Sequence, residues 1–249
     1  MIYISASSLK DFMVCKYRYA FRRMKDKSWP LTVPLVKGKV VHDAIEKLET
    51  DVISEDDIAD YLTRELMAGL STPLIEFTKW DSIAKTLDSA KKMVATYIEK
   101  RKGVILENEL SFKIDTHSCT GIPFRLVGRI DQIVERSKGI CVVDLKTSRL
   151  LPTEFEIKGD YQFTVYAFAY ESLYGKPPAA LYNFHLASGK YIEYKRTEKD
   201  MDELVVLLDL MVTELDYRVG EGAWEEYNKS KGWHCNRCSY RYECYKWQS

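Results

Sequence analysis

Two aspartates and a lysine lie where short apolar segments end, and side chains of these types can bind metal ions and stabilise developing charge. Asp144 and Lys146 end the apolar run 140–146, and both should lie on one face because side chains alternate along a strand. Asp131 ends the preceding apolar segment, and a turn at 137–139 would bring the two segment ends together. Two carboxylates beside a lysine could hold a hard divalent cation and place a cationic group at the same reacting centre.

Each of these features also has a common structural explanation. An Asp-x-Lys triplet at a strand end often forms a surface ion pair, and an aspartate before a turn often serves the turn. The combination favours a functional interpretation, because two acids at adjoining strand ends would repel each other without a cation. We therefore predict one site in which Asp131, Asp144 and Lys146 act together.

Four of the six cysteines could bind a second metal. Cys235, Cys238 and Cys244 form a C-x2-C-x5-C pattern near the C-terminus, and Cys15 lies far upstream. Four thiolates suit either structural zinc or an iron–sulfur cluster, and the residue types alone slightly favour zinc. The other two cysteines stand alone in the sequence and are predicted to be structural.

The elements that must position these residues follow from the spacing of apolar residues. Helical spacing predicts helices, the first of them beginning with a capping box at Ser8 and Asp11, and β-branched segments bounded by turns predict strands. The predicted helices cover about 8–23, 38–48, 57–66, 80–101, 161–174 and 200–219. The predicted strands cover about 104–114, 124–134, 140–146, 181–187 and 191–196.

This order of elements predicts an α/β fold with a mixed central β-sheet flanked by helices. We expect 1–249 to form a single domain, with an N-terminal helical insertion over about 25–103 and the core over about 104–200. A C-terminal cysteine segment, about 220–249, would share a metal with residues 1–24. The metal would then join the two ends of the chain.

Composition narrows the class of protein. A hydrophobic content of 46% is ordinary for a globular chain, which argues against wholesale disorder. No apolar run is long enough to span a membrane and the N-terminus lacks the features of a signal peptide, so we expect a soluble protein in the cytoplasm. The 37 basic residues balance 37 acidic ones, which argues against a protein that coats nucleic acid by bulk charge.

A basic stretch near the N-terminus departs from this balance. Between Lys10 and Lys27 there are seven basic residues and two acidic ones. Such a patch could bind a polyanion locally, although on charge alone a solvated helix face is the simpler interpretation.

The order of these motifs resembles that of the PD-(D/E)XK nuclease superfamily, in its RecB-like branch, which includes iron–sulfur exonucleases associated with CRISPR adaptation and with helicase–nucleases. Asp131 resembles the first acid of the family, and Asp144 with Lys146 resembles its (D/E)-x-K element. His42, in GKVVHDAIE, is similar to the metal-binding histidine that this branch carries on an N-terminal helix.

Two further motifs extend the resemblance to nearly the whole chain. Gln162 and Tyr166 are similar to the Q-x-x-x-Y helix of the branch, and a spacing of four places both on one helix face. Ser5-Ala-Ser7 with Cys15, together with the terminal C-x2-C-x5-C, resembles the four-cysteine cluster motif. The similarity therefore runs from Ser5 to Cys244.

The resemblance implies a metal-dependent DNA nuclease, specifically an exonuclease, with a restriction-endonuclease-like core. Its implied ligands for Mg²⁺ or Mn²⁺ are His42, Asp131, Asp144 and the carbonyl of Leu145. The imidazole favours the softer Mn²⁺. Lys146 would orient or deprotonate the attacking water, or stabilise charge in the transition state. Gln162 would position Lys146 or the substrate, with Tyr166 alongside.

The resemblance also implies a cofactor and partners. The four cysteines, Cys15, Cys235, Cys238 and Cys244, would hold a 4Fe–4S cluster, with zinc as the alternative. Basic residues beside Cys15 would contact the DNA backbone, namely Lys16, Arg18, Arg22 and Arg23. The implied partners are DNA, single-stranded or with free ends, and helicase, recombination or adaptation proteins.

Two other classes of function fit part of the pattern. A non-catalytic DNA-binding or scaffold protein of the same fold would not need the intact set of acids and lysine. A zinc-stabilised interaction module would leave that set unexplained. Glu109, in the strand before Asp131, is a weaker candidate for a supporting role at the metal, and a surface strand acid is an equally good interpretation.

Overall fold

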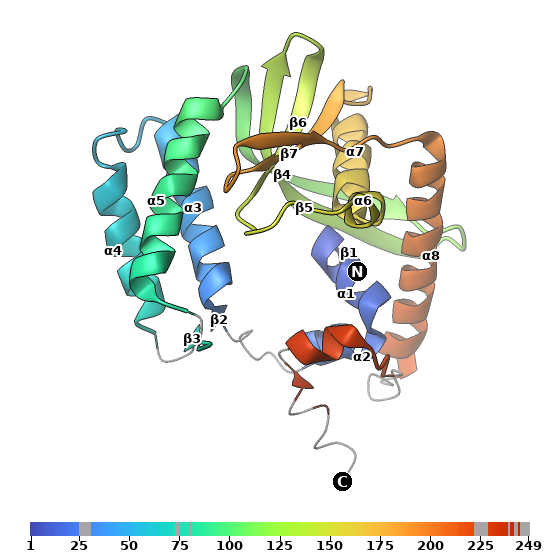
Figure 1. The fold of residues 1–249 in the computed structure, drawn as a ribbon. Coiled ribbons are helices and arrows are strands. Elements are labelled where there is room, and N and C mark those ends of the chain that lie inside the picture. The colour runs from blue at the N-terminus through green and yellow to red at the C-terminus, as the bar shows by residue number, and fades with distance from the viewer. Residues whose placement is uncertain are drawn as a thin grey trace. The chain divides into compact units, whose positions relative to one another are not determined.

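The computed structural model describes residues 1–24, 31–72, 75–79, 81–221, 229–238, 240–241 and 244, and Figure 1 labels its helices and strands. The chain divides into two compact units, each discontinuous in sequence. Unit 1 comprises Met1–Trp29, Ser111–Gly128 and Arg196–Ser249. Unit 2 comprises Pro30–Leu110 and Arg129–Lys195.

Helices α3 (Val33–Glu49), α4 (Ile58–Leu70) and α5 (Ile83–Lys100) of unit 2 pack against one another (Figure 1). Each carries apolar residues at helical spacing, so each buries one face. These faces meet sheet residues such as Leu145 and Phe184 in one hydrophobic core. Burial of the apolar face of α3 fixes the direction in which its polar residues point.

The sheet of unit 2 is mixed, which confirms the predicted fold class. Its strands are β4 (Val104–His117) and β5 (Pro123–Arg136), which both continue into unit 1, followed by β6 (Gly139–Lys146), β7 (Ala180–His185) and β8 (Lys190–Glu193). The β5–β6 and β7–β8 pairs are antiparallel, the β6–β7 pair is parallel, and β4 pairs with β5. A parallel pair needs a crossover, and α6 (Glu154–Lys158) and α7 (Tyr161–Tyr174) lie in it.

Unit 1 contains the remaining helices and one additional strand. Strand β1 (Ile2–Ile4) pairs in parallel with the first residues of β5. The helices are α1 (Ala6–Val14), α2 (Lys16–Met24), α8 (Glu198–Glu221) and the short 3-10 helix η2 (Trp233–Arg237). Residues near both ends of the chain therefore belong to the same unit.

The prediction of one continuous helix over 8–23 is wrong, because the helix breaks at Cys15. Cys15 has an extended backbone, and its N–H donates to the carbonyl of Asp11 to close α1. The capping box is also earlier than predicted, since Ser5 and Ser8 form it. The Asp11 side chain, assigned by prediction to the cap, instead accepts ion pairs from Arg18 and Arg22.

Other differences are small or concern short elements. Strand β1, the parallel pair β2 (Leu31–Thr32) with β3 (Ile75–Glu76), and α6 were not predicted, since each is too short for periodicity to reveal. The described part of the chain contains no helix both long and apolar enough to cross a membrane. The single-domain organisation stays a prediction.

Candidate active site

Asp131 and Asp144 are brought together by the register of two antiparallel strands. The β5–β6 pairing begins at Gln132 with Val143, so the two acids are the next residues along each strand. In place of a further backbone pair, the Leu145 N–H donates to Asp131 Oδ2 at 2.7 Å. Asp131 thus lies inside β5, rather than at the strand end that the sequence suggested, because β5 continues to Arg136.

His42 and Glu109 complete a group of possible metal ligands around Asp131. His42 Nδ1, on α3, lies 3.6 Å from Asp131 Oδ2 and 3.8 Å from Glu109 Oε1 on β4. One ligand atom from each of the three residues lies within 4.8 Å of the others. An imidazole with two carboxylates suits Mn²⁺ or Mg²⁺, so these residues fit a divalent cation.

Glu109 occupies an unusual backbone conformation for a strand residue. Its φ is +51°, a value that residues other than glycine seldom adopt and that costs about 1–3 kcal/mol. The side chain is only 9% exposed, and its carboxylate forms an ion pair with Arg129 of β5. From sequence, Glu109 is only a weak candidate for a supporting role, because nothing in the local pattern signals the left-handed conformation.

Asp144 pairs with Lys146 and not with the histidine group. Its side chain is almost fully buried, and Lys146 Nζ lies 2.7 Å from its Oδ2. That oxygen accepts no well-directed hydrogen bond from the described residues. The lysine ammonium offsets much of the cost of burying this carboxylate, and a divalent cation nearby would offset more of it.

A chain of hydrogen bonds holds Lys146 from the side of α7. Lys146 Nζ donates to Gln162 Oε1 at 2.6 Å, and Gln162 Nε2 donates to the Tyr166 hydroxyl at 2.7 Å. The spacing of four residues on α7 places Gln162 and Tyr166 on the same face. The Asp160 side chain caps α7 by accepting from the Gln162 N–H, which fixes the start of the helix.

The electrostatics of the group reflect several buried carboxylates close together. Burial, followed by repulsion from Asp144, raises the pKa of Asp131 to about 7. Burial lowers the pKa of His42, but the surrounding carboxylates outweigh it and raise that pKa to about 9. Burial also lowers the pKa of Lys146, and Asp144 more than compensates, so the net shift is upward. Lys146 is therefore an ammonium ion at neutral pH.

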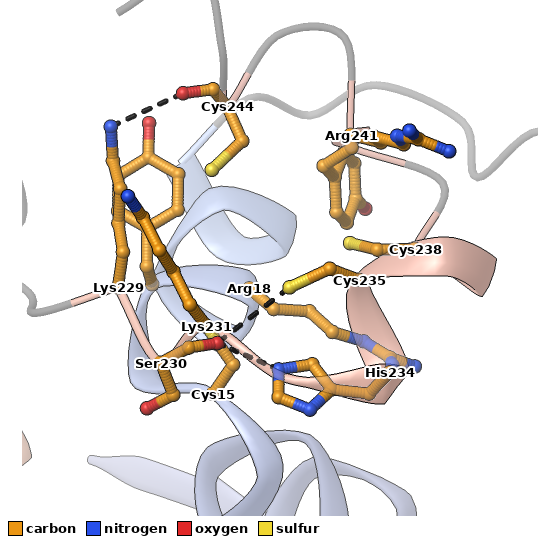
Figure 2. Close-up of a pocket in the computed structure, with 12 residues that line it drawn as sticks. Cys15, Arg18, Lys229, Ser230, Lys231, His234, Cys235, Cys238, Arg241 and Cys244 are labelled. Carbon is orange, nitrogen blue, oxygen red and sulfur yellow. Dashed lines mark hydrogen bonds between the residues drawn. The ribbon is translucent and has the colours of Figure 1, made fainter. Parts of the chain in front are cut away.

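The four cysteines line one pocket of unit 1. Cys15 follows α1, Cys235 lies in η2, and Cys238 and Cys244 follow it, as Figure 2 shows. The pocket has a volume of about 50 Å³. Among the described cysteines, no three sulfur atoms lie within 4.8 Å of one another. The thiols therefore face a common space without converging on one point.

The predicted DNA-contacting residues of α2 are mostly engaged in ion pairs within unit 1. Lys16 pairs with Glu214 of α8. Arg18 and Arg22 both pair with Asp11, at 2.8 and 2.6 Å. The side chain of Arg23 lies outside the described residues. These pairs stabilise the packing of α2, and a role in DNA binding stays a prediction.

A mixed sheet that carries clustered carboxylates beside a lysine is the arrangement expected of a nuclease. A family model described as "PD-(D/E)XK nuclease superfamily" matches residues 3–245, so the chain belongs to this superfamily. The mixed sheet flanked by helices agrees with the fold of that superfamily. No curated protein matches the chain.

Two solved structures are similar to the chain at low sequence identity. The structure named "Putative exonuclease", from Eubacterium rectale, has a TM-score of 0.54 and 15% identity, covering 94% of this chain and 87% of its own. The structure of a protein named SSO0001 has a TM-score of 0.39 and 16% identity, covering 96% and 94%. The first likeness agrees with the fold, and the second is too weak to support an argument.

The raised pKa values of His42 and Asp131 predict that metal binding depends on pH. A cation must displace protons from both groups, so Mn²⁺ affinity should rise as the pH increases from 6 to 9. Titration calorimetry in buffers of different ionisation enthalpy measures the number of protons released per Mn²⁺ bound. This number should exceed about one at pH 7 and fall to about half at pH 9. Affinity that does not change with pH would contradict the assignment, and His117→Ala, an exposed histidine elsewhere, should behave as wild type.

The position of Glu109 predicts that it contributes to metal binding. Glu109→Gln should weaken Mn²⁺ binding by about 10- to 100-fold, because it removes a carboxylate from the His42 group. Glu107→Gln makes the same chemical change at an exposed position two residues away on β4, and should bind Mn²⁺ as wild type does. Equal affinities for the two variants, measured by calorimetry, would leave Glu109 without a role at the metal.

Proposed function

We propose that the protein is a deoxyribonuclease of the RecB-like branch, an exonuclease that hydrolyses phosphodiester bonds with Mn²⁺ or Mg²⁺. The observation that carries this proposal is the meeting of His42, Glu109 and Asp131 next to the Asp144–Lys146 pair. A scaffold protein would gain nothing from burying this much like charge, which is why we favour catalysis over the non-catalytic alternative.

The proposed ligands are the side chains of His42, Asp131 and Asp144 and the Leu145 carbonyl, with Glu109 added to the set. A bound Mn²⁺ or Mg²⁺ supplies Lewis acidity toward the scissile phosphate and toward an attacking water. Asp131 and Leu145 are held together by their own hydrogen bond, so both strands present their groups in a fixed relation. The imidazole of His42 favours Mn²⁺ over Mg²⁺.

The residues of the chain have distinct tasks in this proposal. Lys146, charged at neutral pH, stabilises the negative charge that develops on the phosphate oxygens. Gln162 restrains the ammonium through its 2.6 Å hydrogen bond, and Tyr166 restrains Gln162 in turn. Because its charged form is favoured, Lys146 serves first as an electrostatic group. Lys146 could act as a base only after its ammonium group has lost a proton, which requires that the negative charge around it first be reduced.

Two substitutions should separate metal binding from catalysis. Asp144→Ala should abolish cleavage and weaken Mn²⁺ binding, because it removes a proposed ligand. Lys146→Ala should abolish cleavage while retaining metal affinity, because it removes only the cationic group. Calorimetric Mn²⁺ titration and cleavage assays on end-labelled DNA test both variants, with Lys138→Ala as the matched lysine control. Wild-type turnover by Lys146→Ala would refute the proposed role of this lysine.

The proposal that the enzyme is an exonuclease rests on the resemblance to the RecB-like branch. The structure from Eubacterium rectale carries the word exonuclease in its name, which describes that protein only. The mode of cleavage is tested with Mn²⁺ on linear and covalently closed circular single-stranded DNA. Cleavage of the linear strand alone supports an exonuclease. Cleavage of the circle would show that the enzyme is an endonuclease.

For the cysteine pocket we propose a 4Fe–4S cluster held by Cys15, Cys235, Cys238 and Cys244. A tetrahedral zinc with Zn–S bonds of 2.3 Å would place its sulfurs about 3.8 Å apart. No three of the described sulfur atoms lie within 4.8 Å of one another, and a space of about 50 Å³ could hold about three to five waters. A cluster of several atoms suits this geometry better than one ion does.

Basic side chains around the pocket are a second observation in favour of an anionic cluster. Arg18, Lys229, Lys231 and Arg241 line it together with the cysteines (Figure 2). Burial, assisted by neighbouring thiols, raises the pKa of both Cys238 and Cys244, so these thiols are protonated until a metal binds. The role proposed for the cluster is structural, because none of its ligands belongs to the acid–lysine group.

Replacement of one cysteine tests the cluster. Cys238→Ala should yield colourless protein with a lower melting temperature, because the metal no longer joins α1 to the η2 segment. Wild-type protein should be brown and contain iron and acid-labile sulfide at about four each per chain. Cys119→Ala, an exposed cysteine of the same unit, is the matched control and should keep both colour and stability. Zinc in place of iron in anaerobically purified protein would contradict the cluster identity.

A further inference from the structure

The segment 147–161 leaves the active site and returns to it. It begins after Lys146 at the end of β6 and ends before Gln162 at the start of α7. These two flanking residues are hydrogen-bonded to each other at 2.6 Å. Both ends of the segment are thus fixed to proposed catalytic machinery, and Figure 1 shows its chain leading from β6 into α6.

The segment is ordered by its own hydrogen bonds. Thr153 and Glu156 form a complete capping box at the start of α6. The Ser148 hydroxyl donates to the Leu150 carbonyl at 3.2 Å. At its beginning the segment lies close to α3, since a Cβ on Gly38 would stand 3.0 Å from the Thr147 hydroxyl oxygen. The segment therefore presents its side chains from a defined backbone.

Three apolar side chains of this segment are left in water. Phe155 is 85% exposed, Leu150 76% and Leu151 40%. Exposed apolar groups this close together are costly to maintain, so they commonly mark a binding surface. Leu150 follows Lys146 by four residues, so its Cα lies within about 14 Å of the lysine Cα.

The charge of the segment argues against binding through phosphates. Its two basic residues, Arg149 and Lys158, are outnumbered by its acidic residues Glu154, Glu156 and Asp160. A strand whose phosphate occupies the active site must place the neighbouring bases, one sugar away from the backbone, beside that site. The exposed apolar groups are suited to the faces of those bases, which aromatic side chains bind by stacking.

We propose that the segment 147–161 is a nucleobase-binding rim of the active site, in which Phe155 stacks on a base of the strand being cut and Leu150 contacts its neighbour. This inference rests on the proposed nuclease function and specifies its substrate. Base faces are free only where a strand is unpaired. The rim therefore selects single-stranded DNA or a frayed end over an intact duplex.

The rim can be tested by removing the bases and the side chain separately. Full-length Asp144→Asn protein prevents cleavage, and binding is measured to a twelve-nucleotide thymidine strand and to an abasic strand of equal length. Phe155→Ala should weaken binding to the thymidine strand by about 5- to 150-fold, the effect of one lost stack, and leave binding to the abasic strand unchanged. Phe155→Tyr should restore the wild-type affinity.

Matched controls separate this inference from the proposed function. Leu173→Ala, an exposed leucine at the far end of α7, should bind both strands as the parent does, and circular dichroism melting should show that each variant folds. Equal weakening for thymidine and abasic strands, or no weakening by Phe155→Ala, would overturn the rim while cleavage by the wild-type protein stands. A change in self-association with unchanged DNA binding would assign the surface to protein contact and also overturn it. If wild-type protein cleaves no DNA, the proposed function fails first.

Discussion

Repulsion among buried carboxylates is the interaction on which the rest of the site depends. Asp131, Asp144 and Glu109 lie within one small region of unit 2, and each reaches it by a different strand. The protein offsets the repulsion with cations: His42 faces two of the acids, Lys146 pairs with Asp144, and Arg129 pairs with Glu109. These partners offset the repulsion in part through the proton on His42, so a divalent ion that displaces this proton takes over the same task.

Secondary structure sets these distances. The β5–β6 register places two acids side by side, and the buried face of α3 directs His42 toward them. The β6–α7 crossover brings Gln162 back to Lys146, so the parallel connection that completes the sheet also supplies the group that orients the lysine. Fold and chemistry are therefore coupled through a few side-chain hydrogen bonds, and the exposed segment between Lys146 and Gln162 is framed by the same bond.

The sequence predicted much of this arrangement, for identifiable reasons. Strand alternation predicted the acid–lysine set, because it states which face of a strand a side chain occupies. His42 and the Gln162–Tyr166 pair were predicted through the family resemblance. The break at Cys15 has no proline or glycine to announce it, and the left-handed backbone of Glu109 depends on tertiary contacts that no local pattern encodes. The spacing of the cysteine sulfurs is likewise a property of the folded chain, because Cys15 is distant in sequence from the other three.

A divalent cation would relieve the carboxylate repulsion at this site. The most direct test of this is a crystal structure with Mn²⁺, using diffraction data on both sides of the manganese absorption edge. We expect an anomalous peak within about 2.5 Å of the His42 imidazole and of the Asp131 carboxylate, with Asp144 or Glu109 completing the ligands. Crystals soaked in Mn²⁺ that show no peak there, or a peak held by other residues, would contradict it.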